Sequence, residues 1–139
     1  MINNIFTGLY EHSVDSKGRV SIPAPYKNAI KDDMFFPVVN TLGNNPFLEI
    51  HSFSNLSGLS AEFLRSNAHK LDKRIELDEE GRTVLNKALR DELNLDLEKN
   101  PVVFFGMWTC FGLCKKSDWN NVRQYISAIG KSSPRKLAP

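Results

Sequence analysis

The sequence of 139 residues lacks the features that mark membrane-spanning, secreted or disordered chains. Its longest apolar runs, such as residues 102–108, are far shorter than the ~20 residues that cross a bilayer. The start, MINN, has neither the basic flank nor the apolar stretch of a signal peptide. With 41% hydrophobic and 24% charged residues, the composition is that of an ordinary globular protein. We therefore expect one cytoplasmic domain without a membrane partner.

A large excess of charge of one sign is also lacking. The formal net charge is +2, which does not by itself predict binding to nucleic acid. Residues 1–63 carry a net charge of −2 and residues 64–139 a net charge of +4, of which the last nine residues supply three basic groups. Any surface that binds an anion must therefore be local.

Cysteine is scarce, which limits both disulfide and zinc chemistry. Cys110 and Cys114 would face the same side of a strand about 13 Å apart at ~3.3 Å per residue, too far for a disulfide. A second pair of cysteines or a nearby histidine that would complete a zinc site is missing from the sequence around them. We expect both to be buried as small hydrophobic residues.

Signatures of catalysis are lacking as well. His12, His51 and His69 are scattered without metal-ligand spacing, and the sequence has no glycine-rich phosphate loop or nucleophile motif. His12 and Asp15 resemble an acid–base pair, but a surface pair is the favoured interpretation. We therefore expect no enzyme, no cofactor, no metal site and no small-molecule substrate.

What the sequence does contain is one pattern that occurs twice. Residues 15–19 (DSKGR) return 63 positions later as residues 78–82 (DEEGR). Aspartate accepts backbone N–H bonds of its own turn and glycine supplies a positive φ, so each copy is predicted to be a hairpin tip. The residues expected to shape these turns are Asp15, Gly18, Asp78 and Gly81. The strands expected beside them are residues 11–14, 20–22, 75–77 and 83–85.

The arginine that ends each pattern is not needed for the turn. A guanidinium at the same offset twice suggests a ligand, whereas the simpler alternative is that Arg19 and Arg82 only pair with the aspartate of their own turn. A guanidinium at a hairpin tip can donate two bonds to a guanine edge or clamp a phosphate, and a neighbouring lysine adds a point charge. Arg19 and Lys17 fit these two tasks.

The offset of 63 extends beyond the turns. Shifted by this amount without a gap, the sequence keeps apolar residues in register through four elements; the aligned pairs include Val14 with Leu77, Ile22 with Leu85, Tyr26 with Leu89, Val39 with Val102 and Leu48 with Phe111. We infer two copies of one unit, residues 5–67 and 68–130, within a single domain 1–130. Residues 131–139 are expected to be a flexible basic tail.

Each unit is predicted to run strand, turn, strand, short helix, strand, turn, strand, longer helix. Pro23 and Pro25 are predicted to open the first short helix, and Asn86 to cap the second. Two further hairpins are expected, from residues 34–39 with 47–53 and from residues 102–107 with 110–114. The longer helices carry apolar stripes from Leu56 to Leu71 and from Trp119 to Ile129, with Ser54 and Ser117 as N-caps and Gly130 as a stop.

These segments resemble the MraZ family, bacterial regulators related to the AbrB-type swapped-hairpin transcription factors. The resemblance covers residues 6–126 and rests on residues 6–8 (FTG), 14–23 (VDSKGRVSIP), 77–82 (LDEEGR), Leu89 with Arg90, 104–106 (FFG), 111–113 (FGL) and Trp119.

The resemblance implies an α+β fold, a tandem pseudo-repeat of AbrB-like swapped hairpins that forms a β-barrel with flanking helices. It also implies a homo-oligomeric ring that binds repeated boxes of double-stranded DNA in a promoter, at the nucleoid. In the family that promoter belongs to the division and cell-wall gene cluster, including the regulator's own gene. The alternative is that the chain is a protein-interaction or antitoxin-like module with the swapped-hairpin fold, which uses the arginine turns to bind a protein partner.

The candidate DNA-binding residues are Lys17, Arg19, Arg82, Lys27 and Arg90. Lys27 and Arg90 lie in the two predicted short helices. Glu79 and Glu80 make the second turn acidic. We therefore expect the first turn to contribute more to DNA binding, and the second to serve the fold or a subunit contact.

Overall fold

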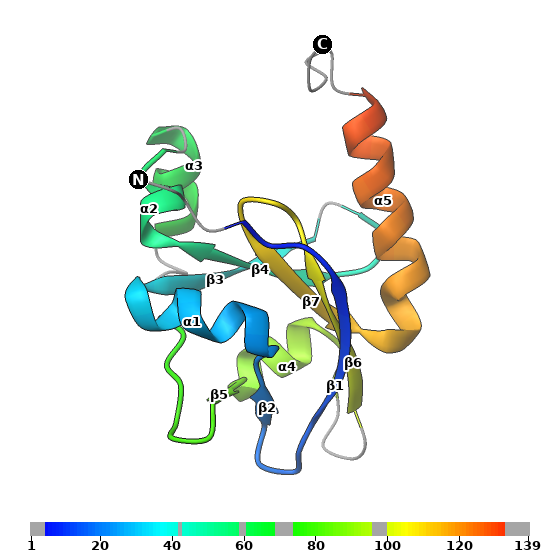
Figure 1. Ribbon diagram of the computed structural model, residues 1–139. Coiled ribbons are helices and arrows are strands. Elements are labelled where there is room, and N and C mark those ends of the chain that lie inside the picture. The colour runs from blue at the N-terminus through cyan, green and yellow to red at the C-terminus, as the bar shows by residue number, and fades with distance from the viewer. Residues whose placement is uncertain (1–4, 42, 59–60, 69–73, 96–99, 133–139) are drawn as a thin grey trace.

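Strands and short helices alternate along most of the chain. The computed structural model describes residues 5–41, 43–58, 61–68, 74–95 and 100–132. The elements are β1 (Leu9–Val14), β2 (Arg19–Ser21), α1 (Ala24–Asp32), β3 (Phe35–Asn40), β4 (Phe47–Ser52), α2 (Phe53–Leu56), α3 (Ala61–Asn67), β5 (Arg82–Val84), α4 (Lys87–Glu92), β6 (Asn100–Gly106), β7 (Phe111–Lys115), a 3₁₀ turn (Lys116–Asp118) and α5 (Trp119–Ser132) (Figure 1). All strand pairs are antiparallel, which agrees with the α+β class predicted from the sequence.

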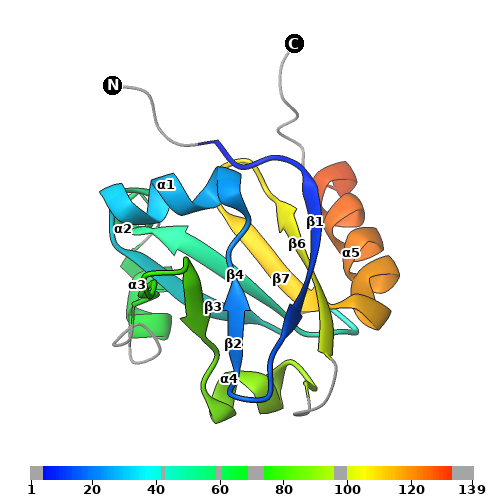
Figure 2. The same cartoon turned by 60° about the horizontal axis from the view of Figure 1, so that its bottom comes forward.

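The strands of the two halves of the chain are interleaved. Five of them form a sheet in the order β1-β6-β7-β4-β3, and β2 pairs with β5 in a separate two-stranded ribbon. The first strand therefore lies beside β6, and β4 lies beside β7 (Figure 2). Each of these pairings joins a strand of the first half of the sequence to one of the second half.

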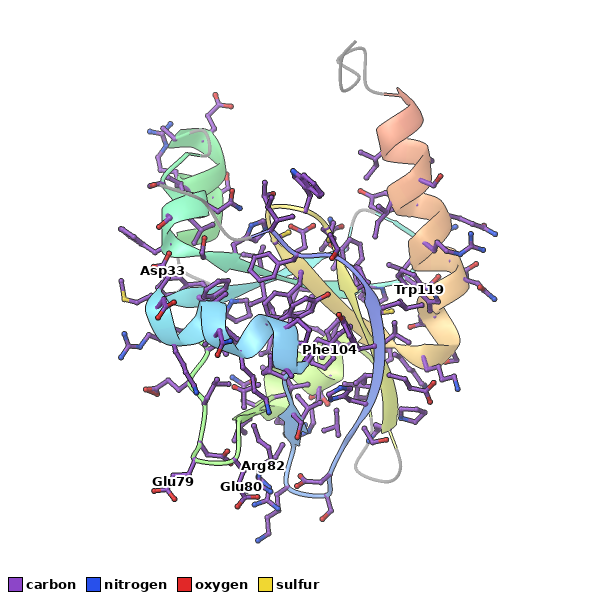
Figure 3. All side chains as sticks on the ribbon, viewed as in Figure 1. Asp33, Glu79, Glu80, Arg82, Phe104 and Trp119 are labelled. Atoms are coloured by element: carbon purple, nitrogen blue, oxygen red, sulfur yellow. The ribbon has the colours of Figure 1, made fainter. Side chains whose placement is uncertain are left out.

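The five-stranded sheet is buried on both faces near its centre. Successive side chains of a strand point to opposite faces, and in β6 this alternation places Val102 and Phe104 in the main core but Val103 and Phe105 in a second cluster. The second cluster lies under α5, where the rings of Phe105 and Trp119 are 4.7 Å apart (Figures 1 and 3). Helix α5 thus covers one face, and the ribbon and α1 lie against the other.

The main core explains how α1 is held. Tyr26 is 1% exposed, stacks on Phe111 at 4.5 Å between ring centroids, and donates its hydroxyl proton to the carbonyl of Thr7 at 2.8 Å. A buried apolar side chain of this size contributes about 1.5–3 kcal/mol to folding. This packing fixes the position of the ribbon, because α1 directly follows β2 along the chain.

Several local predictions are confirmed. Pro23 is the N-cap of α1 and Pro25 lies in its first turn. Asn86 caps α4, where its side chain accepts a hydrogen bond from the backbone N–H of Leu89. The hairpins β3–β4 and β6–β7 are both present. For the two helix starts, the signal is a short-range bond or a backbone restriction that does not depend on distant residues.

The two predicted turns are present, closed by backbone bonds from Asp15 to Arg19 and from Asp78 to Arg82, both at 2.9 Å, but the prediction that the flanking strands pair as hairpins is wrong. β1 pairs with β6 and β2 pairs with β5, so the strands beside residues 15–19 diverge into different sheets. The expected strand at 75–77 is also missing from the described residues, although the N–H of Ile75 donates to the carbonyl of Phe35 at 2.7 Å. Tertiary pairing with the other half of the chain overrides the local preference here.

The ends of the longer helices also differ from the prediction. The first is divided into α2 and α3, and Ser52 caps α2 while Ser54 donates its hydroxyl proton to Asp33 at 2.7 Å. Ser117 lies in the 3₁₀ turn before α5, and α5 continues past Gly130. Leu71 and residues 133–139 of the predicted tail lie outside the described residues.

Candidate nucleic-acid interface

The first candidate turn, residues 15–19, is built around one carboxylate. Asp15 Oδ1 accepts the backbone N–H groups of Lys17 at 2.9 Å and Arg19 at 2.8 Å. Its Oδ2 accepts Arg19 Nε at 2.7 Å. Gly18 has a φ of +81°, which favours glycine, and its N–H bonds to the Asp15 carbonyl at 3.0 Å. Asp15 therefore shapes the turn and holds its arginine in one orientation.

The second turn, residues 78–82, repeats this geometry. Asp78 Oδ1 accepts the N–H groups of Glu80 and Arg82, both at 2.9 Å, and Oδ2 accepts Arg82 Nε at 2.9 Å. Gly81 has a φ of +78°. The four residues predicted to shape the turns are thus found where the two turns need them.

The hydrogen bonds within each turn stabilise the ionised carboxylate of its aspartate. The backbone N–H of Arg19 is the main cause that lowers the pKa of Asp15, and the Arg19 guanidinium and the Lys17 N–H lower it further, against a smaller opposing effect of burial. The N–H of Arg82 lowers the pKa of Asp78 in the same way. The bonds of each turn are therefore strongest when its aspartate is ionised.

Both arginines lie on one outward face of the β2–β5 ribbon. Its register pairs Arg19 with Val84, Val20 with Thr83 and Ser21 with Arg82. Since directly paired residues share a face and neighbours alternate, the middle pair points inward, where Val20 is 1% and Thr83 4% exposed. The two outer pairs form the opposite face, on which Val84 is 60% exposed. Val84 and Ser21 belong to this surface although sequence reasoning did not select them; their alternation with Val20 and Thr83 was the available signal.

Each turn is joined to the other half of the chain by equivalent bonds. The N–H of Ile22 donates to the carbonyl of Gly81 at 3.1 Å, and the N–H of Leu85 donates to the carbonyl of Gly18 at 2.8 Å. The donors are 63 positions apart, as are the acceptors. The two turns therefore lie at the same end of the molecule, below the ribbon in Figure 1.

The remaining two candidate DNA-binding residues, Lys27 and Arg90, each lie against the turn that belongs to the other half of the chain. A Cβ added to Gly81 would lie 2.6 Å from the Lys27 side chain of α1, and one added to Gly18 would collide with the Arg90 guanidinium of α4. Arg90 also donates to the carbonyl of Leu85. The structure therefore gathers Lys17, Arg19 and Arg90 at the first turn, and Arg82 and Lys27 at the second.

The two turns differ in charge. Among the described residues, the terminal Nη groups of Arg19 have no partner, whereas Arg82 Nη2 lies 3.5 Å from Glu80 Oε1 (Figure 3 labels Arg82, Glu79 and Glu80). The first turn carries two basic residues and one acidic residue, and the second carries one basic residue and three acidic ones. The first turn therefore has a net positive charge and the second a net negative charge.

Outside this surface, the structure modifies one expectation from the sequence. Cys110 and Cys114 carry free thiols and are buried, as predicted. Although no histidine is near the cysteines in the sequence, the fold brings His51 and Glu49 to Cys110. His12 packs edge-on against Phe104 at 5.5 Å between ring centroids, while Asp15 is bonded within its turn.

In the part of the chain that the structure describes, no helix is long and apolar enough to span a bilayer.

Comparison with known proteins identifies the family. The sequence model of the family described as "MraZ protein, putative antitoxin-like" matches residues 5–75, about half of the chain. Proteins named "Transcriptional regulator MraZ" are similar over most of their length. The protein from Desulforamulus reducens is 29% identical over 89% of this chain and 91% of its own, and that from Acetivibrio thermocellus is 26% identical over 96% and 97%. The one from Thermoanaerobacter pseudethanolicus is 27% identical over 81% and 82%. The chain belongs to the MraZ family.

Proposed function

We propose that this protein is a DNA-binding transcriptional regulator, as the names of its relatives suggest. The observation that carries the proposal is the β2–β5 ribbon, which has two arginines on its outward face and a buried inner face. The major groove of B-DNA admits a two-stranded β-ribbon, and arginine donates two hydrogen bonds to the edge of a guanine. A transcriptional regulator is not an enzyme class, and no catalytic step is proposed.

Arg19 is the central residue of the proposed DNA contact. Asp15 occupies its Nε, so the guanidinium is oriented before DNA arrives and its two Nη groups remain for a base edge or a phosphate. Lys17, exposed in the same turn, supplies a phosphate contact. Arg90 supports the turn through its contact with Gly18 and its bond to the Leu85 carbonyl. These groups place three cations along one edge of the ribbon.

We assign a smaller DNA contribution to the second turn. Arg82 is paired with Asp78 and lies near Glu80, and a phosphate approaching it would meet three carboxylates. Lys27 partly offsets this charge from α1. The second turn therefore supports the ribbon and a subunit contact more than it contacts DNA.

We infer that the domain, residues 1–130, is a tandem pair of swapped-hairpin units, residues 5–67 and 68–130, that closes into a barrel with flanking helices. Equivalent bonds in the two turns support this inference, as does the exchange of Lys27 and Arg90 between them. The short helices α1 and α4 follow β2 and β5 at corresponding positions, which also agrees with a repeat.

One subunit offers few DNA contacts, in keeping with its small net charge. We therefore propose that several copies assemble into a ring and bind repeated promoter boxes together, since linked weak sites gain affinity through a high effective concentration. The proposed target is the promoter of the division and cell-wall gene cluster, including the protein's own gene, which places the protein at the nucleoid in the cytoplasm.

A gel shift of the full-length protein on the DNA upstream of its own gene tests the proposal. We expect Arg19→Ala to weaken binding by about 1–3 kcal/mol and to reduce the salt dependence by about one phosphate contact. Arg82→Ala, matched in size and charge, is expected to have a smaller effect. Lys87→Ala serves as a control, because Lys87 is an exposed residue paired with Asp91.

The salt series also separates DNA binding from the alternative of a protein partner, which the family's antitoxin-like description keeps open. Binding to DNA weakens steeply with salt because counterions are released. The absence of a shift at low salt would contradict the regulator proposal, and an unchanged affinity of Arg19→Ala would remove Arg19 from the interface.

A further inference from the structure

Three side chains with metal-ligand atoms meet beside β4, far from the two turns. Glu49 and His51 share one face of β4, two residues apart. The β4–β7 ladder pairs Ile50 with Phe111, so its continuation places Cys110 opposite His51. One ligand atom from each of the three lies within 4.8 Å of the others.

Two of these side chains are already held in place by neighbouring amides. Glu49 Oε2 accepts a hydrogen bond from Asn40 Nδ2 at 2.8 Å. His51 Nδ1 lies 2.8 Å from the side-chain amide of Asn55 in α2. Metal-binding histidines and carboxylates in proteins are usually oriented by such outer contacts. The cluster therefore has polar side chains beside it that can orient Glu49 and His51 as ligands.

The same contacts argue against a nucleophilic role for Cys110. His51 Nε2 lies 2.8 Å from Glu49 Oε1, so both ring nitrogens are engaged and neither is available as a base for the thiol. Burial, together with the negative charge of Glu49, raises the pKa of Cys110 to about 12. A neutral, buried thiol becomes a strong ligand only when a metal ion displaces its proton.

We propose that Glu49, His51 and Cys110 bind one zinc ion. Thiolate sulfur and imidazole nitrogen exclude magnesium and calcium, and a carboxylate beside them suits zinc. Ligand atoms around a tetrahedral zinc ion are roughly 3.3–3.7 Å apart, so side-chain shifts of about 1 Å complete the site. Water fills the fourth position.

Zinc binding at this site would release one proton and move another. The Cys110 thiol releases one proton to solvent when zinc binds. His51 keeps one proton, which moves to Nδ1 so that Nε2 can bind zinc, and the Asn55 amide turns over so that its oxygen accepts the Nδ1–H bond. Glu49 binds as the carboxylate.

The proposed ion would fasten the connection between β6 and β7. This connection contains Trp108, which has a φ of +75°, and it is joined to the N-terminal segment by the bridge between Phe6 and Trp108. In Figure 1 it lies at the opposite end of the molecule from the two turns. Zinc is therefore expected to raise thermal stability, and the inference does not depend on the proposed DNA binding.

Titration of the metal-free, full-length protein with Co²⁺ tests the site. We expect a thiolate-to-cobalt charge-transfer band that saturates at one ion per chain and disappears when Zn²⁺ is added, and a rise in Tm with Zn²⁺. Cys110→Ser should abolish the band. Cys114→Ser is the matched control, because Cys114 is also a buried free thiol but has no place in the cluster.

Two further outcomes decide the proposal. His51→Gln is expected to weaken Zn²⁺ binding at least tenfold while circular dichroism shows a folded protein. A folded wild-type protein without the band, a band that persists in Cys110→Ser, or unchanged Zn²⁺ affinity in His51→Gln would overturn it. If Cys110→Ser does not fold, His51→Gln and Glu49→Gln carry the test in its place.

Discussion

At the scale of single residues, the two turn glycines have the same backbone conformation but different surroundings. A Cβ on Gly18 would lie 2.9 Å from the Leu85 carbonyl oxygen and would collide with the Arg90 guanidinium. The three atoms nearest to a Cβ on Gly81 all belong to the Lys27 side chain, at 2.6–3.0 Å. Backbone and a bonded guanidinium cannot move aside as easily as the end of a lysine.

We therefore predict that Gly18→Ala destabilises the protein more than Gly81→Ala. The positive φ alone costs an alanine about 1–2 kcal/mol at either position, and the collision at Gly18 adds to it. Urea unfolding of both variants measures the difference. Equal losses of unfolding free energy in the two variants would mean that the Arg90 side chain moves aside from an added Cβ at little cost.

The two turn aspartates predict how stability depends on pH. Hydrogen bonds lower the pKa of Asp15 and Asp78 below the ordinary value of 3.8. Their contribution is therefore complete above this value and is lost as the pH falls through the lower folded value. Replacing both by asparagine should reduce stability at pH 7 and make the loss of stability in acid less steep.

Urea midpoints between pH 7 and pH 3 check this prediction. Glu79→Gln is the matched control, since Glu79 is an exposed carboxylate in the second turn with no bond partner among the residues that the structure describes. A double variant with the same acid dependence as the wild type would contradict the assignment.

The turns could be predicted from the sequence because their bonds lie within five residues. The aspartate, the glycine and the arginine of each pattern satisfy one another locally. The position of Lys27 at the second turn and Arg90 at the first could not be predicted in this way, because it depends on the exchange of elements between the two halves. The cluster around Cys110 has the same origin, since it needs the β4–β7 ladder.

At the scale of elements, α4 links the core to the first turn. Its six residues are too few for a stable helix in isolation, so its cap matters. Asn86 accepts the N–H of Leu89 at 2.9 Å, and Arg90, one residue farther on, packs against Gly18. Loosening the start of α4 would therefore loosen the support of the first turn.

We predict that Asn86→Ala lowers the free energy of unfolding by about 1 kcal/mol, as for other N-cap residues. Asn86→Asp should restore most of this loss because aspartate also caps helices. Thermal or urea unfolding measures both. A variant with alanine that is as stable as the wild type would show that α4 does not depend on its cap.

The sequence predicted the positions of most strands correctly but predicted the wrong pairing partners for β1 and β2. Hydrophobic patterns located β3, β4, β6 and β7, but they placed β1 beside β2 and expected a strand at 75–77. Sequence-neighbouring strands often pair, yet here β1 pairs with β6 and β2 with β5. Periodicity reports which face of a strand is buried, not which strand lies beside it.

At the scale of the whole molecule, neither half of the chain has a complete sheet. The pairs β1–β6, β2–β5 and β4–β7 all cross from the first half to the second. The main core also draws on both halves, for example Tyr26 with Phe111. If residues 5–67 and 68–130 are repeats, they are repeats that fold together and not domains that fold alone.

We therefore predict that fragments 1–67 and 68–139 are each unfolded when expressed separately and regain the native circular dichroism spectrum when mixed. Separation leaves β1 and β2 without their partner strands and β4 with β3 alone, and it exposes to water the main-core residues of each fragment. Size-exclusion chromatography should show a 1:1 complex after mixing, and denaturant should unfold this complex at a midpoint that rises with fragment concentration. A single fragment that unfolds cooperatively by itself would contradict the interleaved fold, because β3–β4 or β6–β7 would then suffice as a stable sheet.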